Sequence, residues 1–344
     1  MNTLLLCLAG ALLAGDQPPA AKPAAASAFL TQTNKVTEPA SNDPVERQYQ
    51  LLMEADDKAQ GEVDEWIREN NAFEEKGAGI PKEAMNERIR LRFAPIRQGY
   101  EDFLRDHPNH AKAHIAYGSF LNDIREEDAA EAEWEKARKI DPKNPSSWNN
   151  LANHYGHAGP ASKAFEYYEK AIELEPKESI YYHNLGTTVY LFRRDAMAYY
   201  KLDEQSVFNK ALALYAQALK YDPDNFVLAH DVAQTYYGIR PIRTDDALGA
   251  WTNALKLATS VEEKQGVYIH MARFNMNAER FDLAHKWIAE VNLDRYADLK
   301  GRLVQNLAKQ EADAKSRGTG ATNAPPTAAT AARPEEKAPG KPPQ

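Results

Sequence analysis

Prolines that close acidic or polar turns recur along this chain at an interval of 34 residues. Pro108, Pro142 and Pro176 keep that spacing, and Pro223 follows 47 residues later, which is 34 plus 13. Between these prolines apolar residues recur at steps of three and four, and no segment alternates with a period of two. A period of this length is typical of repeated pairs of helices. The sequence therefore predicts an all-α body made of stacked helical hairpins.

Small residues keep a second register within this period. Alanines seven residues apart recur in four units: Ala130 and Ala137, Ala164 and Ala171, Ala211 and Ala218, Ala247 and Ala254. Seven residues make about two helical turns, so both alanines of a pair lie on one face of a helix. Packed helices approach to about 8 to 10 Å, and small side chains are needed where they cross. The alanines therefore predict the crossing points of the second helix in each pair.

The second unit carries the fullest motif of the chain. Its residues are Trp148, Leu151, Ala152, Tyr155, Ala164, Tyr168, Ala171 and Pro176. In this pattern the chain resembles the tetratricopeptide repeat (TPR) family. The resemblance implies a right-handed α-α superhelix, a TPR solenoid, whose first helices line a concave groove that binds extended or helical peptides. It covers residues 109–292 as about five units and fades toward the C-terminus, where Thr259 stands in a proline slot.

The segments outside the array have different compositions. Residues 44–108 predict N-terminal helices that include a divergent repeat-like pair, and the amphipathic segment 293–315 predicts a helix that caps the stack. Residues 29–43 are mostly polar and predict a linker. Residues 316–344 contain no large apolar side chain, so they cannot bury enough surface to offset the entropy of ordering. We expect disordered termini, with 316–344 as a disordered tail.

The N-terminus carries an unbroken run of apolar and small residues from Leu4 to Ala14. This run is too short to span a bilayer as a helix and has the length of a signal-peptide core. Ala26 and Ala28 form a small-x-small pattern for cleavage, so residues 1–28 predict a signal peptide, although no basic segment precedes the run. A retained anchor is the alternative. We expect an exported, periplasmic or extracytoplasmic protein with no integral membrane span in the mature chain.

Residues 44–76 place apolar or small side chains on one face of a long helix. One interpretation is a coiled-coil arm that makes the chain a dimer. A heptad continued from Leu52 would, however, place Asp56 in the seam, where a charge is costly. A second stripe, which includes Phe93 and Tyr100, follows a glycine-containing turn and offers a partner in the same chain. We therefore favour an N-terminal helical hairpin, and the oligomeric state stays open.

Composition argues against several classes of function. The net charge of -8 gives no broad basic surface for nucleic acid. The only cysteine is Cys7, so the body of the chain can build neither a disulfide nor a thiol nucleophile. No glycine-rich phosphate loop, HExxH motif or GxSxG motif is present. The sequence therefore predicts a protein that is not an enzyme and needs no metal or cofactor.

Polar residues four positions apart follow the start of each expected first helix. The candidate groove residues are Ser119, Asn149, Asn153, His183, Thr187, His230, Gln234 and Arg273. Side chains four apart share a helix face, and an asparagine amide can both donate to and accept from a bound backbone. They predict a peptide-binding stripe for a protein or peptide partner of unknown identity. The alternative is that these are solvated helix faces without a ligand.

The third unit carries 13 extra residues between its helices, within an insertion at 193–203. We expect a loop here, because insertions in solenoids map to loops beside the binding face. Met197, Tyr199 and Tyr200 could form a lip over the groove, or they could pack the loop onto its own repeat. A second functional hypothesis follows from this loop: an accessory factor or enzyme of envelope or cell-wall assembly, with a site around His183, His230 and Tyr199.

Overall fold

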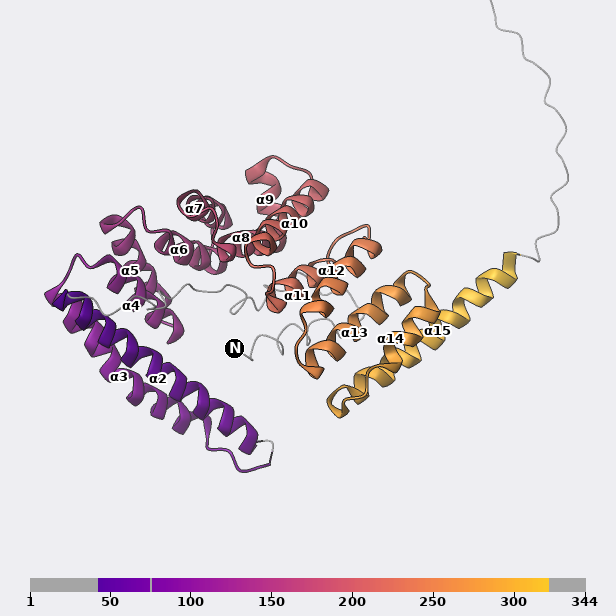
Figure 1. The fold of residues 1–344 in the computed structure, drawn as a ribbon, viewed down its shortest axis with the longest axis horizontal. Coiled ribbons are helices and arrows are strands. Elements are labelled where there is room, and N and C mark those ends of the chain that lie inside the picture. Colours follow the sequence, from indigo (N-terminus) through magenta and orange to yellow (C-terminus); the bar gives the residue numbers. More distant parts are fainter. Residues whose placement is uncertain (1–42, 75, 322–344) are drawn as a thin grey trace, which may run out of the picture. The chain divides into compact units, whose positions relative to one another are not determined.

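The computed structural model describes residues 43–74 and 76–321, with side chains as far as residue 317 (Figure 1). Its helices are α2 (Pro44–Glu74), α3 (Lys82–Asp106), α4 (Ala111–Asp123), α5 (Glu127–Ile140), α6 (Pro145–Ala158), α7 (Ala161–Leu174), α8 (Ser179–Leu191), α9 (Arg193–Tyr200), α10 (Glu204–Tyr221), α11 (Phe226–Thr235), α12 (Thr244–Leu257), α13 (Val261–Asn277), α14 (Phe281–Ala289), the 3-10 turn η1 (Asp294–Tyr296) and α15 (Ala297–Ala321). No strand occurs among these residues, and the all-α prediction is confirmed. The expected signal peptide, the linker up to residue 42 and the tail beyond residue 321 lie outside the described residues.

The chain divides into two compact units between Thr235 and Tyr236. The first unit holds α2 to α11, and the second holds α12 to α15. The division falls between the two helices of the fourth expected repeat. The sequence pattern carries two extra residues just after this point, by the spacing from Ala233 to Ala247, but it predicts no boundary there.

The first unit is built of helical hairpins that follow one another in the chain. The long helices α2 and α3 pair first, and α4 with α5, α6 with α7, and α8 with α10 form the next pairs (Figure 1). The second helix of one pair also packs on the first helix of the next, as α5 does on α6. Large aromatic side chains fill the space between the helices: Phe120, Trp134, Phe165, Tyr168, Tyr181, Phe208 and Tyr215 are fully buried.

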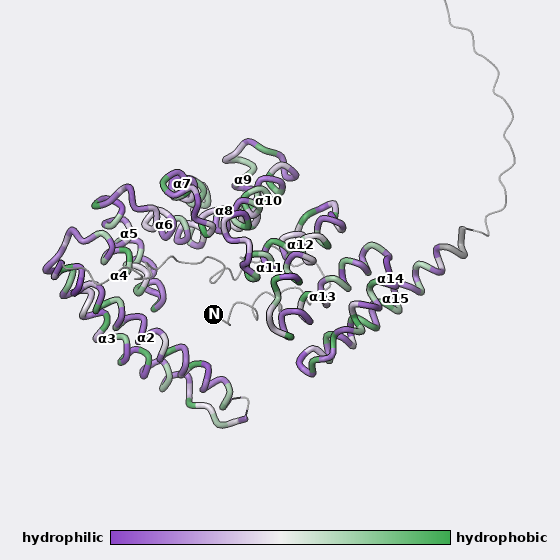
Figure 2. The backbone as a smooth tube through the Cα atoms, in the orientation of Figure 1, coloured by the Kyte–Doolittle hydropathy of each residue, from purple (hydrophilic) through white to green (hydrophobic). Residues whose placement is uncertain are grey.

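The helices are amphipathic rather than uniformly apolar. Hydrophobic and hydrophilic residues are interspersed along them (Figure 2), as expected when one face of a helix is buried and the other faces water. Within the described part of the chain, every helix is too short or too polar to cross a membrane.

The N-terminal hairpin confirms the expected pairing of α2 with α3. Tyr49 and Met53 of α2 are buried in it, as are Tyr100 and Phe103 of α3. The apolar face of α2 is therefore covered by its own chain. This packing accounts for the stripe that a coiled-coil arm would also have required.

Asp56 is buried within this hairpin although a charge was expected to be costly there. The hydroxyl of Tyr100 donates a hydrogen bond of 2.6 Å to Asp56 Oδ2, and the Gln60 amide lies 3.4 Å from Oδ1. Burial raises the pKa of the Asp56 carboxyl, and the hydrogen bonds from Tyr100 and Gln60 oppose this effect only in part. Two hydrogen-bond donors therefore lower the free-energy cost of burying this carboxyl without removing it.

The raised pKa of Asp56 predicts a pH-dependent effect of Asp56→Asn. Because the folded protein binds this proton more tightly than the unfolded chain, the contribution of Asp56 to stability is greatest in acid and falls as the pH rises through the raised pKa. Asparagine can still accept from Tyr100 and has no charge to bury. We expect the variant to match the parent protein in acid and to exceed its stability near neutral pH, as measured by urea unfolding.

The exposed neighbour Asp57 supplies the control for this prediction. Asp57→Asn removes one negative charge from the same helix without altering the buried contact, so it should give no comparable gain near neutral pH. A lower stability of Asp56→Asn near neutral pH would contradict the conclusion that burial dominates the energetics of this carboxyl.

Several helices of the array, among them α6 and α10, begin after a polar residue whose side chain accepts a hydrogen bond from the first turn. Asn144 Oδ1 accepts from the backbone of Ser146 at 3.0 Å, as an N-cap residue should. Asp203 Oδ1 likewise accepts from the Ser206 backbone at 2.7 Å and caps α10 after the insertion. These caps satisfy backbone donors that the helices leave free.

The insertion in the third repeat is a helix and not the loop that we expected. Residues Arg193 to Tyr200 form α9, and the helix ends at Lys201, whose φ of 54° is left-handed. Arginine, alanine and methionine favour helix, and Asp195 lies in the first turn, where a negative charge is favourable. Local propensity therefore forms a helix where the repeat pattern alone indicated only extra residues.

The second compact unit has a hydrophobic core of its own. His270 of α13 stacks on the buried ring of Trp251 with centroids 4.1 Å apart, and the buried Leu303 and Leu307 of α15 join the core formed with α14. The expected capping helix is present, but it starts at Ala297 after a 3-10 turn instead of at residue 293. It also continues to Ala321, so the first residues of the expected tail are helical.

Candidate functional site

A chain of side-chain amides joins the first helices of the first unit. Asn150 of α6 donates to Ser119 Oγ of α4 over 3.3 Å, and Asn149 donates to Asn150 Oδ1 over 3.2 Å. Ser119 in turn donates to the backbone carbonyl of Ile115. All three polar side chains are buried. These contacts link α4 to α6 through polar groups that satisfy one another.

The same chain of amides continues from α6 to α8. The amide nitrogen of Asn184 lies 3.1 Å from Asn149 Oδ1 and 3.3 Å from Asn153 Oδ1. The hydroxyl of Tyr168, on α7, donates to Asn153 Oδ1 over 2.5 Å. Because buried polar groups are costly unless they are hydrogen-bonded, this network specifies the register between neighbouring helices. We call the five residues Ser119, Asn149, Asn150, Asn153 and Asn184 the amide ladder.

One carboxylate and two imidazoles continue the row of polar side chains from α8 to α11. His183 Nε2 lies 3.3 Å from Asp231 Oδ2, and His230 Nδ1 lies 3.7 Å from Asp231 Oδ1. Burial raises the pKa of the Asp231 carboxyl, but hydrogen bonds from the two histidines outweigh burial, and the pKa is lowered overall. Gln234 lies 3.3 Å from His230, one helical turn away. The carboxylate therefore holds two imidazoles of different helices together.

Equivalent contacts recur in three successive hairpins at the 34-residue spacing. One ring in each first helix is hydrogen-bonded to the carbonyl of the turn proline six residues earlier: His114 to Pro108 at 2.9 Å, Trp148 to Pro142 at 2.9 Å, and Tyr182 to Pro176 at 3.0 Å. A Cβ added at Gly118 would lie 2.5 Å from the Trp134 ring, and one at Gly186 would lie 3.0 Å from the Tyr215 ring. The chain has the tetratricopeptide repeat fold.

The structure corrects the expected environment of four groove candidates in this TPR array. Ser119, Asn149, Asn153 and His183 are buried and bonded to neighbouring helices, so they do not form a solvated polar stripe. Sequence periodicity placed them on one face of their helices, but it did not show that the adjacent helix supplies their hydrogen-bond partners. Their side chains hold the array together.

Three other groove candidates, on α8 and α11, are half-buried and belong to the row of polar side chains that crosses the first helices. Thr187 of α8 is within 3.1 Å of the Tyr215 hydroxyl, and His230 and Gln234 come from α11. We call Thr187, His230 and Gln234 the first-helix face. Arg273 belongs to the second compact unit of the chain, where it is half-buried on α13 and interacts with Tyr237.

The expected lip residues lie against a second helix. The rings of Tyr199 and Tyr200 pack on Phe165 of α7, with centroids 5.3 and 5.5 Å apart. The hydroxyl of Tyr200 donates to Glu169 of α7 over 2.9 Å, and Met197 is half-buried in the same core. The structure thus places α9 against α7 and not across the first helices.

The residues of the expected alternative enzyme site do not converge. His183 and His230 meet at Asp231, whereas Tyr199 packs on Phe165. Among residues 43–74 and 76–321, no group of three or more histidine, cysteine or carboxylate side chains has a geometry that could hold a metal ion.

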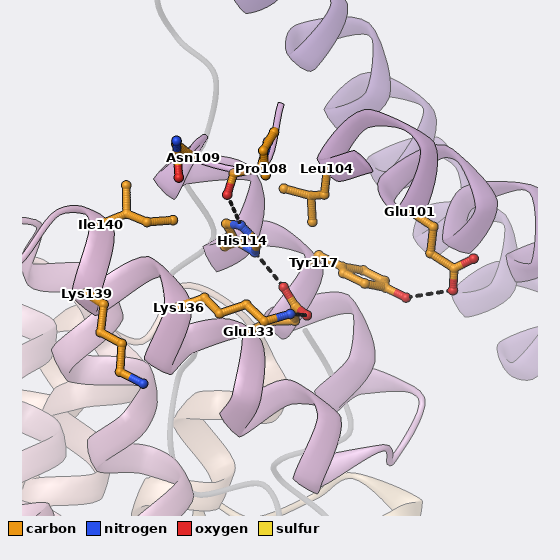
Figure 3. A pocket seen from close by; sticks show the side chains of 10 residues that line it. All are labelled: Glu101, Leu104, Pro108, Asn109, His114, Tyr117, Glu133, Lys136, Lys139 and Ile140. Atoms are coloured by element: carbon orange, nitrogen blue, oxygen red, sulfur yellow. Dashed lines mark hydrogen bonds and ion pairs between the residues drawn. The ribbon is translucent and has the colours of Figure 1, made fainter. Parts of the chain in front are cut away.

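A pocket of about 520 Å³ opens in the first unit where α3, α4 and α5 meet (Figure 3). Its apolar lining includes Leu104, Ile140 and the Tyr117 ring, and the Tyr117 hydroxyl donates to Glu101 over 3.1 Å. Lys139 lies at its edge and is exposed. None of its lining residues is among the site residues predicted from the sequence.

A buried charged pair forms one wall of the pocket. His114 Nδ1 lies 2.5 Å from Glu133 Oε2, and its Nε2 lies 2.9 Å from the Pro108 carbonyl (Figure 3). Burial raises the pKa of the Glu133 carboxyl, but hydrogen bonds from His114 and Lys136 outweigh burial, and the pKa is lowered overall. Both ring nitrogens of His114 therefore lie within hydrogen-bonding distance of an oxygen atom.

Comparison with known proteins bears on the fold alone. No protein-family model and no curated protein matches the sequence. Among solved structures, the chain is similar to YrrB, a TPR protein with an unusual peptide-binding site, at 14% identity and a TM-score of 0.45, over 60% of this chain and 97% of YrrB. It is also similar to PilW, a widely conserved type IV pilus biogenesis factor, at 15% identity and a TM-score of 0.49, over 64% of this chain and 94% of PilW. A thermophilic TPR protein of Thermus thermophilus matches at 20% identity and a TM-score of 0.40, over 58% of this chain and 99% of its own.

Proposed function

We propose that this protein is a non-enzymatic scaffold that binds a polypeptide along the first-helix face of its TPR array. The observation that carries the proposal is the continuous row of hydrogen-bonding groups across α4, α6, α8 and α11. The amide ladder makes this row rigid, because each buried amide has a protein partner. A rigid surface loses less conformational entropy on binding than a mobile one.

The half-buried groups at the end of the row have the chemistry that a peptide backbone requires. Thr187 and His230 can donate or accept, and the Gln234 amide can do both at once. An extended peptide presents alternating donors and acceptors, so side chains of this kind can pair with it without any sequence-specific pocket. The proposal therefore concerns a polypeptide partner and not a small substrate.

Gln234→Lys is the variant that tests this proposal. A lysine at this position cannot accept a hydrogen bond, and it adds a charge beside His230. We expect the variant to fold as the parent does and to bind a partner recovered by cross-linking from the native cell roughly tenfold more weakly, the effect of one important interface contact. Titration of the purified partner against both full-length proteins measures the difference.

Ser162→Lys supplies the matched control, because Ser162 is exposed on α7, a second helix. This variant adds the same charge away from the first-helix face and should leave the affinity unchanged. Equal affinities for the Gln234→Lys and parent proteins, or equal losses for both variants, would contradict binding at the first-helix face.

We also propose that the protein acts outside the cytoplasm. The support is the apolar run Leu4 to Ala14 and the small residues Ala26 and Ala28, which suit export and cleavage. Cell fractionation with sequencing of the mature N-terminus tests this. An uncleaved chain recovered only from the cytoplasm would overturn the proposal.

A further inference from the structure

The pocket in Figure 3 has a filled counterpart one repeat later in the chain. The pocket residues Leu104, His114 and Glu133 have equivalents 34 residues later in the next repeat. These equivalents are Arg138, Trp148 and Tyr167. There the rings of Trp148 and Tyr167 meet edge to face at 5.1 Å, and the Arg138 guanidinium lies 5.0 Å from the Trp148 ring. An aromatic pair covered by an arginine therefore occupies the equivalent space.

Smaller side chains stand at these positions around the pocket. His114 and Glu133 replace the two rings, and Leu104 replaces the covering arginine. His114 keeps the hydrogen bond to the turn carbonyl that Trp148 also makes. The backbone register is thus retained while the large aromatic body is missing, and the pocket of about 520 Å³ lies at this place.

One ammonium group at the edge of this space is available to an anion. The pocket is lined by two lysines and two carboxylates: Lys136, Lys139, Glu101 and Glu133. Glu133 is already paired with His114 at 2.5 Å and with Lys136 at 2.7 Å. Lys139 is exposed and has no ion-pair partner among the described residues. An incoming carboxylate would therefore find an available ammonium group.

We propose that this pocket is a second binding site, which receives a large apolar side chain next to a carboxylate from a partner polypeptide. The apolar side chain takes the place of the missing rings between Leu104, Tyr117 and Ile140, and the carboxylate pairs with Lys139. A pocket of this volume suits a group of that size. The proposal does not depend on the first-helix face, because the pocket is formed by α3, α4 and α5.

A pair of short blocked peptides tests the inference on the full-length protein. The first contains leucine followed by glutamate, and the second contains leucine followed by glutamine. With methyl-labelled protein, we expect the glutamate peptide to shift the signals of Leu104 and Ile140 in a saturable way and the glutamine peptide to bind roughly fivefold more weakly. Absence of any shift, or equal affinity for both peptides, would overturn the proposal.

Two variants locate the interaction. Lys139→Glu should weaken the glutamate peptide by at least the same factor, whereas Lys177→Glu, an exposed lysine after the next hairpin, should not. The double variant His114→Trp/Glu133→Tyr copies the following repeat and should fill the pocket, so it should fold with a similar unfolding midpoint and lose binding. Retained binding in the folded double variant would overturn the proposal, as would saturable shifts from a long-chain fatty acid but from neither peptide.

Discussion

Trp134→Ala is expected to lower the free energy of unfolding by about 3 to 5 kcal/mol, the usual cost of removing a buried tryptophan. The Trp134 side chain is 1% exposed, and its indole nitrogen donates to the Ile115 carbonyl over 3.2 Å. Its ring lies so close to Gly118 that a Cβ there would come within 2.5 Å of it. The helices cannot close this space without losing their register, so most of the cavity should remain. Urea unfolding followed by circular dichroism measures the loss.

Trp148→Ala is the control for this experiment, because Trp148 stands in another slot of the next repeat and is only half-buried. It should cost less than Trp134→Ala, since less apolar surface is lost from the interior. Trp134→Phe keeps most of the ring and should lie between the parent and the alanine variant. Equal effects of Trp134→Ala and Trp148→Ala would contradict the assignment of Trp134 as the ring that separates α4 from α5.

Asn184→Leu should destabilise the protein by about 1 to 3 kcal/mol, because it removes the donor to the buried Asn149 Oδ1 and one of the two donors to Asn153 Oδ1. Asn184 donates to Asn149 Oδ1 and to Asn153 Oδ1 and is fully buried. Leucine is larger than asparagine, so overpacking adds to this loss, and a double variant isolates the contribution of the hydrogen bond. Chemical unfolding of the two proteins under one set of conditions measures it.

A double variant separates the ladder from a general effect of the substitution. Asn149→Leu/Asn184→Leu removes both partners of one hydrogen bond, so its cost should be smaller than the sum of the two single costs. Asn86→Leu, at an exposed site on α3, should have little effect. Strict additivity of the two ladder variants would show that their amides are not coupled.

The repeat framework could be predicted from sequence because it rests on local spacing. Gly118 and Gly186 lie where the chain needs small residues, and each lies against a ring of its partner helix. Asp203 could be predicted as an N-cap because the partner is only three residues away. Short-range rules of this kind do not depend on the rest of the fold.

The environment of polar residues could not be predicted in the same way. Asn149 is bonded to Asn184, which is 35 residues away on another hairpin, and one helix cannot show whether its neighbour supplies a donor. A charge at Asp56 was expected to be costly in a buried seam. The carboxyl accepts a hydrogen bond from Tyr100, which lies 44 residues later in the chain, on α3. Periodicity identifies the face of a helix, but the partner determines whether a polar group on that face is free for binding.

The pocket had a signal in the sequence that spacing alone could have shown. His114 and Glu133 occupy positions where the next repeat has Trp148 and Tyr167, 34 residues later in both cases. Aligning the repeats on the rings of the first helix would have indicated the missing aromatic pair. The ion pair that replaces it could be recognised only from the geometry.

Position-specific photo-cross-linking in the native cell tests the central claim most directly. A photoreactive amino acid at Thr187, on the first helix α8, is compared with one at Ser162, on the second helix α7. If the first-helix face binds a polypeptide, position 187 gives a discrete protein adduct that excess unmodified protein removes by competition, and position 162 does not. An adduct that forms equally at both positions, or at position 162 alone, would contradict the claim.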